Sequence, residues 1–471
     1  MPRSRSFMPR PLPTLPAAPS RDELIARYDG RAPRYTSYPT AVQFSGAVDA
    51  ATHRDWLAGL SPDQAVSLYL HIPFCARLCW YCGCHTRATT RTEPVTEYVD
   101  RLLDELALLE AATPGRLRAR DIHFGGGTPN MLSRDDLNRL FKAIRHVFRV
   151  SPGATVAAEL DPAVLTRDWV RAAAFHGLSR ASIGVQDLSP RVQAAVNRIE
   201  PFEVIERAVG WLREAGVLSV NLDLMYGLPR QTVADVNNTL DAVLTLKPER
   251  LALFGYAHVP WMKANQQLIQ DSELPGPAER LDQSEFASER LQREGYVRIG
   301  LDHYALPDDE LARALAEQRL HRNFQGYTTD ANSVLLGVGV SSISRLPQGF
   351  VQNQGLERNW RDAILRGELP TARGVALTDD DRFRGEIIER LMCDLAVDVD
   401  AILARHADAI GEGPDLEEAF LRLQPFIDDG LVVVDGARLT VTEAGRPLVR
   451  SMAAVFDAYL DPNAGRHSRS L

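Results

Sequence analysis

A regular alternation of strand and helix patterns between residues 66 and 304 constrains the fold most. Short apolar runs typical of buried strands are separated by segments with apolar residues at helical spacing. The expected strands span 66–72, 121–124, 154–160, 180–184, 217–225, 250–256 and 297–304. Strands joined through helices form right-handed βαβ units and a parallel sheet. The sequence therefore predicts an α/β fold with a complete or partial barrel, and a doubly wound sheet is the alternative.

Other patterns flank this region. We expect a disordered tail at 1–20, an N-terminal arm at 21–65, the barrel at 66–345, a connector at 346–374, a helical domain at 375–462 and a second tail at 463–471. In the helical domain, helices are expected at 380–395 and 416–429, and a hairpin at 430–441 turns at Asp435-Gly436. This order of elements resembles a small winged-helix unit.

Composition excludes several classes of protein. The net charge is −9, and residues 375–435 are rich in acid, whereas a nucleic-acid binder usually carries a basic face. No apolar run reaches the length of a membrane span, and the N-terminal segment has no apolar core typical of a secretory signal. We therefore expect a cytoplasmic protein that binds neither nucleic acid nor membrane, in a compartment where clustered cysteines bind metals or do redox chemistry.

Four of the five cysteines fall within ten residues, directly after the first expected strand. Cys75, Cys79, Cys82 and Cys84 have the spacing C-x3-C-x2-C-x-C. A structural zinc site usually needs two separated pairs, and a thioredoxin-like C-x2-C leaves two cysteines unexplained. An iron–sulfur cluster held by thiolates is the favoured interpretation. The fifth, Cys393, lies on an apolar helix face and is predicted to be a core residue.

Polar residues also stand at the ends of expected strands. Gly125-Gly-Gly127 follows a strand, and glycines there let the backbone approach a ligand, although a tight turn would need them equally. Glu159 and Asp223 could accept hydrogen bonds from ribose hydroxyls, or serve as helix caps. Arg198 could clamp a carboxylate, or be an ordinary surface arginine.

The spacing C-x3-C-x2-C, with Tyr81 before the third cysteine, closely resembles the radical S-adenosylmethionine enzymes. The resemblance implies that Cys75, Cys79 and Cys82 hold a [4Fe–4S] cluster with one iron free of protein ligands. S-adenosylmethionine would chelate that iron and be cleaved to a 5′-deoxyadenosyl radical. Gly125-Gly-Gly-Thr-Pro129 matches the superfamily segment that binds the methionine amino group.

Residues 30–460 resemble more narrowly the oxygen-independent coproporphyrinogen III oxidase (dehydrogenase) family. The markers are Tyr35-Thr-Ser-Tyr-Pro-Thr40, Tyr69-Leu-His-Ile-Pro-Phe-Cys75, Cys82-Gly-Cys84, Gly184-Val-Gln-Asp187, Asn221-Leu-Asp-Leu-Met-Tyr-Gly-Leu-Pro229 and His321-Arg-Asn-Phe-Gln-Gly-Tyr327. The implied fold is a partial (β/α)6 TIM-like barrel with an N-terminal arm and a helical C-terminal domain. The alternative, a haem-binding or haem-delivery relative, typically has an aromatic residue at the position of Cys84.

The resemblance also implies site residues. One S-adenosylmethionine would meet Tyr69, Tyr81, Gly126, Glu159 and Ile343, and a second would meet Gly127, Thr128, Gln186, Arg198, Asp223 and Ala257. Tyr69, His71, Cys84 and Gln325 are the catalytic candidates, and Arg34 and Arg322 are candidates for binding substrate carboxylates. The implied reaction oxidatively decarboxylates the ring A and B propionates of coproporphyrinogen III to vinyls, giving protoporphyrinogen IX in haem biosynthesis. A monomer served by a flavodoxin- or ferredoxin-like electron donor is expected.

Overall fold

The computed structural model describes residues 19–411, 413–414 and 416–460. Most of the predicted N-terminal tail and all of the predicted C-terminal tail lie outside the described residues. Among the described residues, no helix combines the length and the apolar character that crossing a membrane requires.

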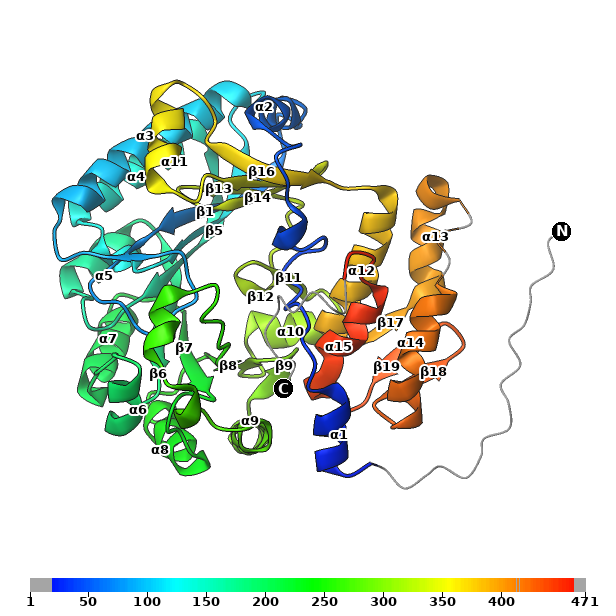
Figure 1. The fold of residues 1–471 in the computed structure, drawn as a ribbon. Coiled ribbons are helices and arrows are strands. Elements are labelled where there is room, and N and C mark those ends of the chain that lie inside the picture. Colours follow the sequence, from blue (N-terminus) through cyan, green and yellow to red (C-terminus); the bar gives the residue numbers. More distant parts are fainter. Residues whose placement is uncertain (1–18, 412, 415, 461–471) are drawn as a thin grey trace.

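One large sheet forms the centre of the molecule, and six of its parallel strands come from consecutive βα units (Figure 1). These strands lie side by side in chain order: β1 (Ala65–Ile72), β4 (Arg118–Gly126), β5 (Arg149–Leu160), β6 (Leu178–Gln186), β7 (Ser219–Tyr226) and β8 (Arg250–Gly255). All six were expected from the sequence. Parallel strands in this order place their carboxyl ends along one edge, where α/β proteins build their sites.

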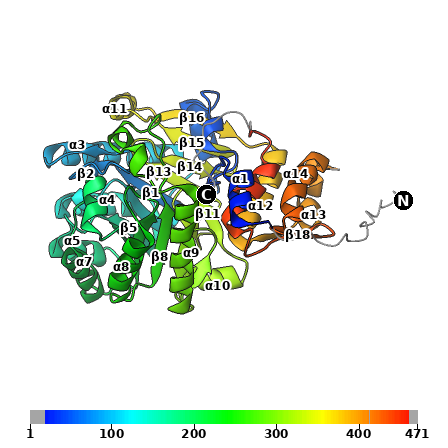
Figure 2. The ribbon, with the colours of Figure 1, turned by 60° about the horizontal axis from the view of Figure 1, so that its bottom comes forward.

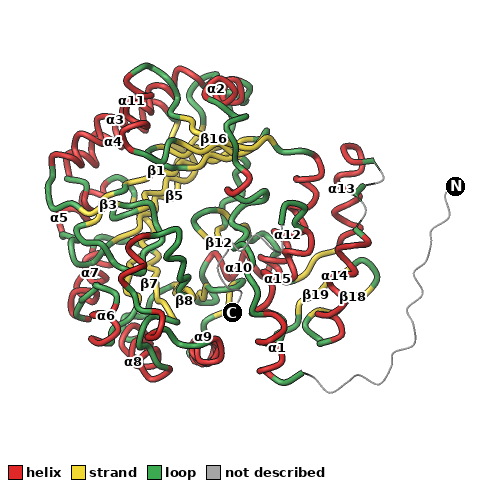
Figure 3. Tube along the Cα trace, viewed as in Figure 1, coloured by secondary structure: helices red, strands yellow, loops and turns green. Residues whose placement is uncertain are grey.

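Helices follow the strands and cover the outer face of the sheet (Figures 1 and 3). They are α3 (Glu93–Ala112), α4 (Arg134–Val147), α5 (Arg167–Phe175), α6 (Pro190–Ala195), α7 (Phe202–Glu214), α8 (Val233–Leu244) and α9 (Pro277–Arg293). Local signals set their starts. For example, the hydroxyl of Ser133 accepts a hydrogen bond from the backbone N–H of Asp136, 3.1 Å away, and caps α4.

The sheet does not close into a complete barrel. β13 (Val334–Val338) pairs in parallel with β1, and β14 (Ile343–Leu346), β15 (Gly349–Asn353) and β16 (Thr371–Ala376) extend that side as antiparallel strands. At the other side β10 (His303–Ala305) pairs antiparallel with β8 and β9 (Val297–Ile299). The expected single strand at 297–304 is thus two strands, because Gly300, with φ of 52°, turns the chain. The expectation of a partial barrel is confirmed.

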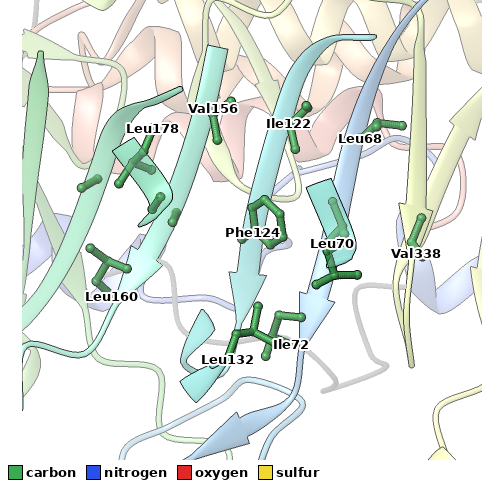
Figure 4. Packing of buried hydrophobic residues seen from close by; sticks show 14 of the residues in the cluster. Leu68, Leu70, Ile72, Ile122, Phe124, Leu132, Val156, Leu160, Leu178 and Val338 are labelled. Atoms are coloured by element: carbon green, nitrogen blue, oxygen red, sulfur yellow. The ribbon is translucent and has the colours of Figure 1, made fainter. Parts of the chain in front are cut away.

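Side chains point alternately to the two faces of each strand, so one set packs in the core and the other faces the barrel interior. Leu68, Leu70 and Ile72 of β1 are fully buried and belong to the large apolar cluster beneath the helices (Figure 4). Burying each such side chain contributes roughly 1.5–3 kcal/mol to the stability of the fold. Because successive side chains point to opposite faces of a strand, Tyr69 and His71 face the interior instead. The same rule places Glu159, Gln186 and Asp223 inside.

A second apolar cluster belongs to the C-terminal part of the chain. It contains α12 (Asp379–Asp394), α13 (Val399–Ile410), α14 (Glu417–Asp428), α15 (Val449–Ala453) and a small sheet of β17 (Ala396–Asp398), β18 (Val432–Asp435) and β19 (Arg438–Val441). The predicted hairpin is present, with Gly436 at its turn. β17 and α13 were not predicted.

The N-terminal arm lies between the barrel and this C-terminal part (Figures 1 and 2). It begins with α1 (Arg21–Tyr28), whose Arg27 pairs with Asp429 at 2.7 Å, and ends with α2 (Ala50–Ala58). Between them the Tyr35 hydroxyl donates to the Asp457 carboxylate, 3.0 Å away, and Arg34 donates to the Gly255 carbonyl at the end of β8, 2.9 Å away. The arm thus connects the two apolar clusters.

Candidate active site

The cysteine loop begins where β1 ends. β1 ends at Ile72, at the carboxyl edge of the sheet, and the cysteines follow from Cys75 onward. Side chains of all four clustered cysteines, Cys75, Cys79, Cys82 and Cys84, line one cavity of about 180 Å³, which we call the thiol cavity. The remaining cysteine, Cys393, is fully buried in a separate core, as predicted.

Glycines at the end of β4 form a second wall of the thiol cavity. A side chain at Gly125 would meet the Glu159 carboxylate at 2.8 Å, and one at Gly127 would meet the Phe74 carbonyl oxygen at 2.7 Å. At Gly126, with φ of 107°, it would collide with the ring of His71. Glycine is therefore required along this wall, and it leaves the backbone open to a ligand.

Two amide side chains from a distant segment hold the backbone of the cysteine loop. The Asn265 amide lies 3.3 Å from the Cys79 carbonyl, 3.0 Å from the Trp80 carbonyl and 2.9 Å from the Cys82 carbonyl. The neighbouring Gln266 amide donates to the Tyr81 carbonyl at 2.9 Å. These hydrogen bonds hold the backbone from Cys79 to Cys82, which carries thiols that line the cavity.

The thiols occupy different electrostatic environments. Burial raises the pKa of Cys75 to about 11. Hydrogen bonding from Cys84, including its backbone N–H at 3.4 Å, lowers the pKa of Cys82 to about 6. The Arg198 guanidinium lies 3.6 Å from the Cys79 sulfur. Positive charge and donated hydrogen bonds favour thiolates, the form that binds metals.

A connected set of polar side chains lines the barrel interior behind the glycines. The Tyr69 hydroxyl lies 3.2 Å from His71 Nδ1, while His71 Nε2 contacts the His85 carbonyl at 2.9 Å. Burial lowers the pKa of His71, so its ring is neutral near pH 7. The Tyr69 ring stacks on His123, with ring centroids 5.8 Å apart. Every ring in this set is therefore fixed by a neighbour.

Glu159 joins the interior set to the glycine wall. One carboxylate oxygen lies 3.1 Å from His123 Nε2, and the other accepts the backbone N–H of Gly126 at 3.0 Å. Burial alone would raise the pKa of Glu159, but these hydrogen bonds outweigh it and the pKa is lowered. Glu159 therefore presents a carboxylate to the cavity at neutral pH.

The end of β6 contributes Gln186 and, through the next turn, Arg198. Gln186 has φ of 68°, and its buried side-chain oxygen has no hydrogen-bond partner among the described residues. Arg198 donates to the Gly184 carbonyl at 2.6 Å and pairs with Glu200 at 3.1 Å. A strained residue with an unsatisfied buried acceptor is typical of a ligand site.

Asp223 of β7 completes the polar lining. Its oxygens accept hydrogen bonds from Ser182 and from the Asn221 amide, both at 2.7 Å. Burial outweighs these bonds and raises the pKa of Asp223 to about 6. The carboxylate is thus present at neutral pH and is lost on mild acidification.

Most predicted cofactor residues meet in the thiol cavity, but three of them, two catalytic candidates and the two substrate candidates do not line it. Tyr69 and His71 lie behind the glycine wall, and Ile343 begins β14 opposite Gln352. Gln325 lines an interior cavity of about 320 Å³ with His303 and Tyr327. Ala257 lines another cavity of about 440 Å³, together with the substrate candidate Arg34. Arg322 faces a fourth cavity beside the arm. The roles of all these residues stay predictions.

Sequence reasoning missed several residues that shape the site: Arg77, His123, Asp161, Ser182, Glu200, Asn221, Asn265 and Gln266. Three of them, His123, Ser182 and Asn221, could have been found, because they alternate with buried apolar residues on predicted strands. The amides of Asn265 and Gln266 stand in a polar stretch with no recognisable spacing, and only the fold brings them to the cysteine loop.

Comparisons with known proteins agree with this architecture. The Radical SAM superfamily matches residues 69–243, and the HemN C-terminal domain family matches residues 377–448. The fold and site thus define a radical S-adenosylmethionine protein, a class that implies a [4Fe–4S] cluster and S-adenosylmethionine.

More specifically, the chain belongs to the oxygen-independent coproporphyrinogen III oxidase family. It is 47% identical over 452 residues to the oxygen-independent coproporphyrinogen III oxidase of Bradyrhizobium diazoefficiens, covering 96% of this chain and 100% of that one. It is 39% identical to the Escherichia coli protein of the same name, covering 94% and 96%. A solved structure of coproporphyrinogen III oxidase from Escherichia coli matches with a TM-score of 0.85 and 38% identity, over 91% of this chain and 98% of that one.

Proposed function

We propose that this chain converts coproporphyrinogen III to protoporphyrinogen IX by oxidative decarboxylation of two propionates. The single observation that supports this most is the thiol cavity, where four cysteines, a glycine wall and buried carboxylates meet. Thiolates are the ligands that iron–sulfur clusters use. The residues present therefore fit the cofactors of the radical S-adenosylmethionine class.

Cys75, Cys79 and Cys82 are the proposed ligands of the cluster, with Cys84 beside it as a free thiol. When bound, the cluster and S-adenosylmethionine supply the one-electron chemistry that removes a hydrogen atom from an unactivated carbon. Arg198 and the hydrogen bonds around Cys82 favour the thiolate forms.

The remaining residues of the thiol cavity are proposed to bind S-adenosylmethionine. Tyr81, Gly126 and Glu159 would contact one molecule, which Tyr69 and Ile343 would enclose from behind. Gly127, Thr128, Gln186, Arg198 and Asp223 would contact a second, with Ala257 as an adjoining wall. Gln186 supplies an unsatisfied acceptor, and Glu159 and Asp223 supply carboxylates for ribose hydroxyls.

Tyr69, His71 and Gln325 are proposed to act on the substrate side of the interior. His71 is neutral and held by the His85 carbonyl, so its ring is oriented without adding charge. The N-terminal arm is proposed to cover the substrate and exclude water, which protects radical chemistry. We further propose a monomer that acts in the cytoplasm with a small electron-transfer protein, and the domain limits expected above.

The test is an anaerobic assay of the reconstituted full-length chain with S-adenosylmethionine, a reductant and coproporphyrinogen III. We expect 5′-deoxyadenosine and protoporphyrinogen IX to appear together, with loss of carbon dioxide. Formation of 5′-deoxyadenosine without a decarboxylated tetrapyrrole would overturn the substrate assignment. The chain would still be a radical S-adenosylmethionine enzyme.

A further inference from the structure

Two cavities inside the barrel meet at a small set of polar side chains. The interior cavity of about 320 Å³ and the thiol cavity of about 180 Å³ share Glu159, Ser182 and Asp223 among their lining residues. His123 and Asn221 line the interior cavity and not the thiol cavity. These two side chains can therefore hold the shared carboxylates from the interior side without occupying the space of a ligand in the thiol cavity.

Strand register places both supporting side chains directly beside the carboxylates. His123 on β4 lies opposite the residue two positions before Glu159 on β5. Asn221 comes two residues before Asp223 on β7 and lies opposite Ser182 of β6. Residues two apart on a strand point to the same face. His123 and Asn221 therefore belong to the layer of interior side chains that lies one step nearer the amino ends of the strands.

His123 fixes one oxygen of the Glu159 carboxylate. Its Nε2 lies 3.1 Å from Glu159 Oε1, while Oε2 accepts the backbone N–H of Gly126 at 3.0 Å. An ionised carboxylate can only accept hydrogen bonds, so His123 Nε2 carries the hydrogen. A side chain at Gly125 would meet Oε1 at 2.8 Å, so this oxygen also packs against the backbone. Both oxygens are thus held, and each can still accept a further hydrogen bond from a ligand.

The same contact influences the charge of Glu159. Burial acts to raise the pKa of Glu159, and the hydrogen bond from His123 is the strongest influence that lowers it. His71 lowers it further through its charge. The ring of His123 also stacks on Tyr69, with centroids 5.8 Å apart and an angle of 26° between the rings. A role in packing against Tyr69 is therefore the competing explanation for His123, and an experiment must separate the two.

Asn221 supports Asp223 in the corresponding way. Its amide nitrogen lies 2.7 Å from Asp223 Oδ1 and 2.8 Å from the Ser182 hydroxyl, which itself donates to Asp223 Oδ2 at 2.7 Å. The amide oxygen of Asn221 is buried and has no hydrogen-bond partner among the described residues. Turning the amide over would place this oxygen against the carboxylate. Because an unsatisfied buried acceptor costs stability, the orientation of Asn221 serves Asp223 rather than the fold.

We propose that His123 and Asn221 are positioning residues, which hold Glu159 and Asp223 ready to accept hydrogen bonds from the ribose hydroxyls of S-adenosylmethionine. This inference rests on the proposed function, in which both carboxylates contact that cofactor. An acceptor that is ordered before binding removes the entropy cost of ordering it on binding. Loss of either support should therefore weaken the affinity for S-adenosylmethionine and leave the cluster ligands in place.

The test measures the affinity of the reconstituted full-length chain for S-adenosylmethionine by anaerobic calorimetry, without tetrapyrrole. His123→Leu removes the donor, whereas His123→Gln retains an N–H that can reach the carboxylate. Each variant is measured alone and in combination with Glu159→Ala, as a double-mutant cycle. His146→Leu is the matched control, because the side chain of His146 on the outer helix α4 is 77% exposed. Iron is measured in every variant.

We expect His123→Leu to weaken the affinity roughly tenfold, with iron unchanged, and His123→Gln to retain most of it. His146→Leu should change neither quantity. In the Glu159→Ala chain, His123→Leu should add little, because the carboxylate that it supports is already absent. Equal losses in His123→Leu and His123→Gln would assign His123 to packing and overturn its proposed role, and so would fully additive losses in the cycle.

Asn221 provides an independent comparison, so a His123 variant that fails to fold does not leave the proposal untested. Asn221→Leu should weaken the affinity in the unsubstituted chain and add little in the Asp223→Ala chain, and fully additive losses would overturn its proposed role. Binding is measured without turnover. An unsubstituted chain that binds S-adenosylmethionine and shows this coupling, but forms no protoporphyrinogen IX, would therefore refute the proposed function and not this inference.

Discussion

The thiol cavity and a second cavity of about 440 Å³, lined by Arg31, Arg34, Arg280, Arg298 and Arg450 and called here the arginine cavity, are built in opposite ways. The thiol cavity takes its cysteines from ten consecutive residues, and its other walls from the ends of four neighbouring strands and the turns that follow them. The arginine cavity takes its charges from the arm, a barrel helix, an edge strand and the C-terminal part.

This difference separates a site that a local motif builds from one that only the completed fold assembles. The thiol cavity needs atoms at fixed spacing around a cofactor, which a short loop and glycines provide. The arginine cavity brings basic side chains together from segments far apart in the sequence, which only the completed fold can do. A substitution in the thiol cavity should therefore act directly on the cofactor that we propose there.

The largest expected effect is the loss of the cluster in Cys79→Ala. Removing one of the three proposed thiolate ligands would leave an iron without its ligand, so we expect iron after anaerobic reconstitution to fall from about four per chain to near zero. Iron analysis and the visible absorption band measure this. Cys84→Ala is the matched control and should retain its iron, so equal loss in both variants would show that Cys84 is also a ligand.

A smaller effect is expected when the support of the cysteine loop is removed. Asn265→Leu deletes the donor shared by the carbonyls of Cys79, Trp80 and Cys82. Lost hydrogen bonds of this kind cost about 1 kcal/mol each, so we expect a cluster that forms but is released to a chelator several-fold faster. Electron paramagnetic resonance of the reduced cluster should also change.

Gln267→Leu is the control for this variant, because Gln267 is exposed and its amide contacts only the Pro260 carbonyl among the described residues. Equal rates of iron release in the two variants would refute a role for Asn265 in holding the loop. The comparison thus tests whether the thiol cavity depends on a segment far from its own motif.

The sequence predicts the thiol cavity much better than the arginine cavity, for a physical reason. Strand periodicity and the cysteine spacing are local, so the sequence alone predicts β1, β4–β8 and the grouping of the four thiols. Asn265 lies 183 residues from Cys82, and Arg450 meets Arg34 from the other end of the chain. No short-range pattern records such contacts, because packing of the completed fold creates them.

The next effect concerns pH. Burial raises the pKa of Asp223 to about 6, so as the pH falls from 7.5 to 5 the carboxylate is protonated and accepts hydrogen bonds less well. We expect the affinity for S-adenosylmethionine to fall over this range, measured by calorimetry. Glu159 and His303 also face Asp223, but Glu159 has a lowered pKa and stays ionised.

Asp223→Asn should bind more weakly at pH 7.5 and lose most of the pH dependence between 5 and 7. The stability of the unsubstituted protein should change with pH in the opposite direction to its affinity for S-adenosylmethionine. Because the pKa of Asp223 is higher in the fold than in the unfolded chain, the native protein gains stability as the pH falls from about 6 toward 4. A pH profile of affinity that is the same in both proteins would remove Asp223 from the site.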